Sequence, residues 1–89
     1  MNKRKLEIIK QLRLLPGVGT SIARDLYDLK IYSQNDLINR DAIMLYEQLS
    51  EFKKVKVDKC MLYVFRCITY FSNHKIHDSQ KLKWWFWKD

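Results

Sequence analysis

The sequence has no apolar run that approaches the ~20 residues needed to span a bilayer. It begins Met-Asn-Lys-Arg-Lys, but the segment 6–15 that follows is interrupted by four polar or charged side chains, so it lacks the apolar core of a signal peptide. We therefore expect no membrane partner and a cytoplasmic protein.

Cysteine is also scarce, because Cys60 and Cys67 are the only two, and they lie seven residues apart. His74 and His77 follow, which adds two residue types that bind zinc. On a straight helix seven residues rise ~10.5 Å, too far for two ligands of one zinc ion and for a disulfide, whose Cα atoms lie within ~7 Å. We expect no metal site, no disulfide and two buried thiols.

Glycine and proline are concentrated in one place, since the two glycines and the single proline all lie within residues 16–19. Gly17 and Gly19 can adopt backbone angles closed to other residues, and they leave room for a ligand to approach N–H groups. The first N–H groups of a helix that begins near Thr20 lack internal partners and carry the positive end of the helix dipole. The turn therefore predicts an anion site, and we expect its ligand to be a nucleic-acid phosphate. The alternative is a turn that only joins two packed helices.

The composition suits one small globular domain, because 47% of the 89 residues are hydrophobic and 30% are charged. The formal net charge of +7 comes from 17 Lys and Arg against 10 Asp and Glu. A positive balance of this size favours a polyanionic partner, although it also serves solubility.

Apolar periodicity predicts helices nearly throughout the chain. Residues 3–15 repeat apolar side chains at helical spacing, and Pro16 ends this helix. Gly19 or Thr20 then caps a second helix, whose apolar stripe continues to Leu29.

Three further helix starts are indicated by polar side chains. Ser33 and Asp36 form a capping box before a short helix, and Asp41 caps a longer one. The apolar side chains of this longer helix are Leu45, Leu49 and Phe52. The run 57–71 is rich in β-branched and aromatic residues, but its apolar positions recur at intervals of three and four, which predicts a largely buried helix.

The hydrophobic-Pro-Gly-hydrophobic-Gly pattern of residues 15–19, with the small Ala23 four positions later, resembles the helix-hairpin-helix motif of DNA-binding and DNA-repair proteins. As a whole the chain resembles small bacterial proteins labelled "pathogenicity locus", which contain such motifs. The matching segments are LPGVGTSIARDLYDL (15–29), VDKCMLYVFRCITY (57–70) and KLKWWFWKD (81–89). The resemblance implies an all-α fold over residues 1–89: about five short helices forming a tandem helix-hairpin-helix (SAM-like) domain, with a Trp-rich tail packed on it.

Within that domain we expect a first hairpin at 5–29, a degenerate second hairpin at 42–72 and an aromatic tail at 79–89. The second turn, Lys53-Lys54-Val55-Lys56-Val57, has no glycine, so its backbone must follow a different path. Asp58 would cap the helix after it. The lysines of this turn either contact the DNA backbone as point charges or form a solvated loop, and both interpretations stay open.

The expected function is sequence-independent binding of duplex or branched DNA, accessory to DNA repair, recombination or processing. Ser21 stands where many such hairpins carry Lys or Arg, so we expect weak affinity from the first hairpin alone. The predicted phosphate contacts are the amides of Gly17, Val18 and Gly19, the hydroxyls of Thr20 and Ser21, and the charges of Arg24, Lys53, Lys54, Lys56 and Lys59.

The tail holds all three tryptophans, Trp84, Trp85 and Trp87. They could stack on unpaired bases, insert into a membrane interface, enter a partner's pocket, or fold back to close the small core. The last is favoured because exposed aromatics invite aggregation. An alternative function is a protein-interaction module that docks onto a larger DNA-processing partner. We expect no enzyme and no cofactor, because no paired nucleophile accompanies the histidines. The oligomeric state is left open.

Overall fold

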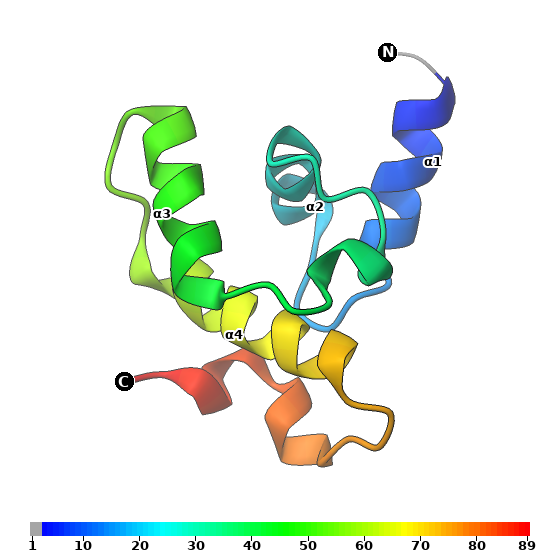
Figure 1. The fold of residues 1–89 in the computed structure, drawn as a ribbon, viewed down its shortest axis with the longest axis vertical. Coiled ribbons are helices and arrows are strands. Elements are labelled where there is room, and N and C mark those ends of the chain that lie inside the picture. Colours follow the sequence, from blue (N-terminus) through cyan, green and yellow to red (C-terminus); the bar gives the residue numbers. More distant parts are fainter. Residues whose placement is uncertain (1–2) are drawn as a thin grey trace.

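The computed structural model describes residues 3–89, and these residues contain helices and turns but no strand (Figure 1). The all-α fold is confirmed, with four α-helices instead of about five, and three short 3₁₀ helices beside them. The α-helices are α1 (Lys3–Leu12), α2 (Thr20–Asp28), α3 (Ala42–Lys53) and α4 (Lys59–Asn73). The 3₁₀ helices are η1 (Gln34–Leu37), η2 (Ser79–Leu82) and η3 (Trp84–Trp87).

The α-helices form two pairs, in which α1 packs against α2 and α3 packs against α4. The short helix η1 lies between the pairs in sequence and contacts α4. Figure 1 shows α4 running below the other helices, with the tail of η2 and η3 beneath it. The central position of α4 explains its composition, because a helix with neighbours on several sides must be apolar around most of its surface.

The core is built from the predicted apolar stripes. Leu26 of α2, Leu45 and Leu49 of α3, and Phe65 and Ile68 of α4 have no exposed surface. The helical spacing of the 57–71 run therefore outweighs its β propensity, as predicted, because the burial of a helix face stabilises more than intrinsic preference does.

Two helix boundaries depend on local hydrogen bonds. The expected end of the first helix at residue 15 is wrong by three residues, because the chain tightens after Leu12. Leu14 N–H donates to Gln11 O and Leu15 N–H donates to Leu12 O, which are bonds of the narrower 3₁₀ type.

The capping box at Ser33 is formed differently from the prediction. The Ser33 side chain makes no cap hydrogen bond, whereas the Asp36 carboxylate accepts from Tyr32 N–H at 2.9 Å. Asp36 thus secures the chain before η1 without a reciprocal bond from Ser33.

Two burial predictions are wrong. Phe52, expected on the core face of its helix, is 56% exposed because α3 buries its face only at Ala42, Leu45 and Leu49. Cys60, expected to be buried, is exposed because it lies in the first turn of α4, whereas Cys67 is fully buried as predicted.

Candidate nucleic-acid interface

The first turn, between α1 and α2, separates its two glycines by role. Gly17 has a φ of +76°, and a Cβ added there would lie 3.4 Å from Cδ1 of Trp84. The neighbouring Val18 is buried, and its N–H donates to Leu15 O at 3.2 Å. Gly17 therefore packs the turn against the tail, whereas Val18 is buried in the core and its amide already has a partner.

Gly19, unlike Gly17, would not bring an added Cβ against the tail. It is the N-cap of α2 in an extended conformation, with φ −97° and ψ −171°, and no heavy atom lies within 4 Å of a Cβ added there. No side chain caps α2, and both Thr20 and Ser21 are exposed. The first N–H groups of α2 therefore have no side-chain cap, and the two exposed hydroxyls beside them can also donate to an anion.

The two helices of the second pair, α3 and α4, begin differently. Asp41 accepts a hydrogen bond from Ile43 N–H at 2.9 Å, and Asp58 accepts one from Cys60 N–H at 2.8 Å, so both predicted caps are confirmed. The hydrogen bond from Cys60 N–H lowers the pKa of the Asp58 carboxyl below its ordinary value. A carboxylate at the start of α4 repels a second anion, so the N-terminus of α2 is the better phosphate site of the two.

The second turn has no glycine, and a lysine adopts the left-handed conformation there. Lys54 caps α3 with φ 57° and ψ 30°, and its N–H donates to carbonyls one turn back, those of Ser50 and Glu51. Val57 N–H donates to Ser50 Oγ at 3.2 Å, and Tyr46 Oη donates to Val57 O. The turn is held by side chains of α3 in place of glycine geometry.

The predicted cations do not gather in one patch of free charge. Arg24, Lys54 and Lys56 are exposed and form no ion pair among residues 3–89. Lys53 Nζ lies 3.0 Å from Oδ1 of Asp25 on α2, and Lys59 Nζ lies 3.9 Å from Oδ2 of Asp89. Two of the four predicted lysines, Lys53 and Lys59, thus face carboxylates of the same chain.

Residues 5–89 match a protein family described as "Pathogenicity locus". The chain belongs to this family. The match confirms the resemblance to this family, and it extends from the first turn of α1 to the end of the tail. No curated protein and no solved structure matches the chain.

In this member of the pathogenicity locus family the three tryptophans have different surroundings. Trp84 is half-buried against the core and Gly17, with Lys88 Nζ 5.7 Å from its ring centroid. Trp87 is partly buried, and its indole N–H donates to Lys81 O at 2.9 Å. Trp85 remains 53% exposed beside Phe86, which is 48% exposed.

The cysteines and histidines do not converge in the family member described here. Among residues 3–89 no group of three or more His, Cys, Asp or Glu could hold a metal ion. Burial raises the pKa of the Cys67 thiol to about 11, and the hydrogen bond with Asp58 raises the pKa of Cys60. His77 Nε2 lies 2.8 Å from Phe71 O, and its ring stacks on that of Phe71.

The helices of residues 3–89 are all too short or too polar to span a membrane.

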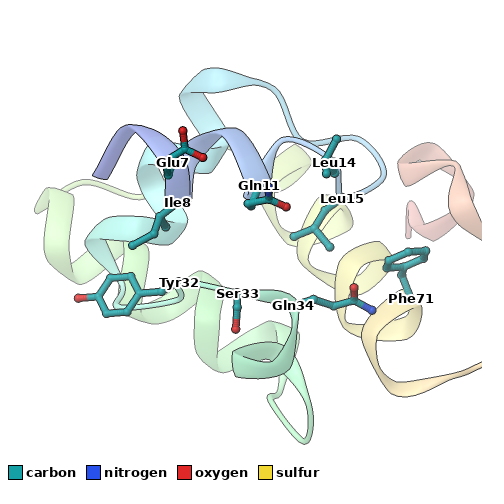
Figure 2. Close-up of a pocket in the computed structure, with 9 residues that line it drawn as sticks. All are labelled: Glu7, Ile8, Gln11, Leu14, Leu15, Tyr32, Ser33, Gln34 and Phe71. Carbon is teal, nitrogen blue, oxygen red and sulfur yellow. The ribbon is translucent and has the colours of Figure 1, made fainter. Parts of the chain in front are cut away.

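A hollow of about 400 Å³ that the sequence did not reveal lies between α1 and the segment 32–34 (Figure 2). Leu14, which is 76% exposed, and Tyr32 lie at opposite sides, and Phe71 closes one end. The sequence contains one signal, because Leu14 lies outside the apolar stripe of the helix predicted over residues 3–15. Glu7 is the charged residue of this lining, so the hollow does not suit a phosphate.

Proposed function

We propose that this protein binds the DNA backbone without sequence preference, and that the N-terminus of α2 holds a phosphate. The observation that carries the proposal is the uncapped start of α2 at Gly19, where no side chain makes a cap hydrogen bond and a Cβ added to the glycine would meet no atom within 4 Å beyond its chain neighbours. Such amides bind anions without any charged side chain, because the helix dipole is positive there.

The proposal interprets the two helix pairs as tandem helix-hairpin-helix units. The turn 13–19 joins α1 to α2, the turn 54–58 joins α3 to α4, and η1 belongs to the connection between the pairs. A left-handed residue lies in each turn, Gly17 in the first and Lys54 in the second. This recurrence supports a common plan for the two turns, while the Asp58 cap distinguishes the second.

The positive charge of the protein supports binding to the phosphate backbone of DNA. The net charge is +7, and Arg24 is exposed one turn after Thr20 on α2. Lys54 and Lys56 add exposed charge at the second turn. If about four phosphates are neutralised, the logarithm of the binding constant falls against log salt with a slope of roughly −3.6.

The test is a fluorescence-anisotropy titration of labelled duplex DNA at two salt concentrations. Gly19→Glu places a carboxylate at the proposed phosphate position. We expect affinity to fall at least about tenfold, because the carboxylate repels the phosphate and displaces it from the charge-assisted hydrogen bonds of the α2 amides. Asn35→Glu adds the same charge at an exposed position of η1 and serves as the matched control. Circular dichroism checks that both variants fold.

Equal losses in the two variants would show that net charge alone governs binding, and would contradict a phosphate at α2. Absence of binding by the unmodified protein at low salt would contradict DNA binding altogether. That result would favour the second candidate function, a docking module for a larger DNA-processing protein, for which the exposed Trp85 and Phe86 provide an aromatic contact surface.

A further inference from the structure

A second hollow, of about 310 Å³, lies among α4, the tail and Arg40, two residues before the start of α3. Its lining includes Arg40, Arg66, Tyr70, His74 and Trp87, and no carboxylate. The volume is at the lower end of what small-ligand sites enclose, roughly 300 Å³. The hollow thus combines aromatic rings with two guanidinium groups, and it differs from the apolar hollow near Leu14.

The aromatic part of this hollow is held in place from several sides. The ring centroids of Tyr70 and Trp87 lie 5.6 Å apart, and those of Tyr70 and His74 lie 4.6 Å apart. Tyr70 Oη accepts from Asp78 N–H at 2.9 Å, while the Trp87 indole donates to Lys81 O. Because these contacts fix the rings before any ligand arrives, a planar ligand would not need to order them.

The two arginines have different amounts of free hydrogen-bonding capacity. Arg66 Nη1 donates to Trp87 O at 2.9 Å and to Asp89 Oδ1 at 2.8 Å, so it positions the tail and its charge is balanced. The guanidinium of Arg40 donates to one acceptor among the described residues, Gln48 Oε1 at 3.2 Å, from Nη2. A guanidinium has five N–H donors, so Arg40 retains donors for an anion at the edge of the aromatic rings.

We propose that this hollow binds one unpaired nucleotide, with its base against Tyr70 and Trp87 and its phosphate on Arg40. Stacking on aromatic side chains tolerates any base, because every base has a π face, and a guanidinium matches the geometry of a phosphate. Bases within a duplex are already stacked on one another, so the site selects single-stranded or branched DNA. The inference rests on the DNA binding proposed above and adds a preference for unpaired strands, through residues outside the two hairpin turns.

The experiment compares Arg40→Ala with Arg4→Ala, which removes the same charge from an exposed position of α1. Each variant is titrated with a labelled oligothymidylate and with a blunt duplex of the same length. We expect Arg40→Ala to weaken single-strand binding at least about fivefold, as for removal of a hydrogen bond to a charged group, and to weaken duplex binding no more than Arg4→Ala does. Equal effects of the two variants on both DNAs would overturn the proposal.

Nuclear magnetic resonance gives a readout that a purely structural role of Arg40 would not move. The chain has three tryptophans, so the indole N–H region contains three signals, which single Trp→Phe variants assign. Oligothymidylate should shift the Trp87 signal, and Arg40→Ala should reduce that shift. A shift confined to Trp85 would place the strand on the exposed face of the tail and overturn the pocket.

The two proposals fail in different ways. Loss of duplex binding in Gly19→Glu, with no selective effect of Arg40→Ala, would leave the hairpin site and overturn the pocket. Selective loss of single strands in Arg40→Ala, with unchanged duplex binding in Gly19→Glu, would do the opposite. Absence of binding to either oligonucleotide by the unmodified protein would overturn both.

Discussion

Lys53 at the end of α3 forms an ion pair with Asp25 of α2, in which Nζ lies 3.0 Å from Oδ1. Asp25 is 8% exposed, and it is the buried charged residue of the described chain. This ion pair therefore links α2 of the first helix pair to α3 of the second, and it gives the buried carboxylate of Asp25 a positive partner. Lys53, which we predicted from the sequence as a DNA contact, thus also forms an ion pair within the protein.

Lys53→Ala should destabilise the fold by about 1 kcal/mol, because Asp25 loses its partner while the 41% exposure of Lys53 limits the loss. Urea unfolding measures the change, and a double-mutant cycle with Asp25→Ala gives the coupling. Lys56→Ala, at an exposed position three residues later, is the control and should change stability by less than about 0.5 kcal/mol. Similar losses in the two lysine variants would contradict the role of the pair.

Alanine should affect the two glycines of the first turn unequally. Gly17→Ala forces a side chain into a positive-φ conformation and against Trp84, and should cost at least about 1 to 2 kcal/mol. Gly19→Ala meets no atom and loses only the small advantage of glycine at an N-cap, about 0.5 kcal/mol. Thermal unfolding of both variants tests this order, and a larger loss at Gly19 would show that the turn is oriented differently.

Glycine in the second turn should stabilise the protein. Lys54 is held at φ 57°, a conformation that costs a non-glycine residue about 1 kcal/mol, so Lys54→Gly should recover part of that energy. The matched variant Lys56→Gly, at a position without positive φ, should be neutral or destabilising. Chemical denaturation of the two variants decides the point, and a loss of stability in Lys54→Gly would contradict it.

The cap of α4 should depend on pH. The hydrogen bond from Cys60 N–H lowers the pKa of Asp58 below its ordinary value of 3.8, so the folded state favours the ionised carboxylate. Its contribution to stability is present above pH 3.8 and is lost as the pH falls through the lowered pKa.

Asp58→Ala should therefore lower the urea midpoint at neutral pH, and the difference from the unmodified protein should shrink in acid. Ser33→Ala is the comparison, because the Ser33 side chain makes no cap hydrogen bond, and its midpoint should match that of the unmodified protein at every pH. A pH-independent effect of Asp58→Ala would show that the carboxylate acts by packing instead of charge.

Local signals explain what could be predicted of the fold from the sequence. The caps at Asp41 and Asp58 and the helical spacing of 57–71 each depend on residues within one or two turns, and the structure confirms them. The exposure of Phe52 and Cys60 could not be predicted, because it depends on where neighbouring helices end. Periodicity assigns a residue to a face of its helix, while burial requires a partner opposite it.

The candidate site shows the same division. Glycine chemistry indicated an anion site at the first turn, and the open space at Gly19 fits that interpretation. The contact that a side chain at Gly17 would make requires Trp84 of the tail, and the hollow beside Arg40 requires side chains from α4 and the tail. Such contacts between distant segments leave no local pattern in a single sequence.

The contact between Gly17 and Trp84 also affects how the protein folds during its synthesis. Chains are made from the N-terminus, so α1, the first turn and α2 leave the ribosome well before the aromatic tail. Until Trp84 emerges, one side of that turn remains open to solvent, or to whatever chaperone holds the nascent chain. A segment made late thus completes a turn made early, and a chain that ends before η3 would have this side of the first turn uncovered.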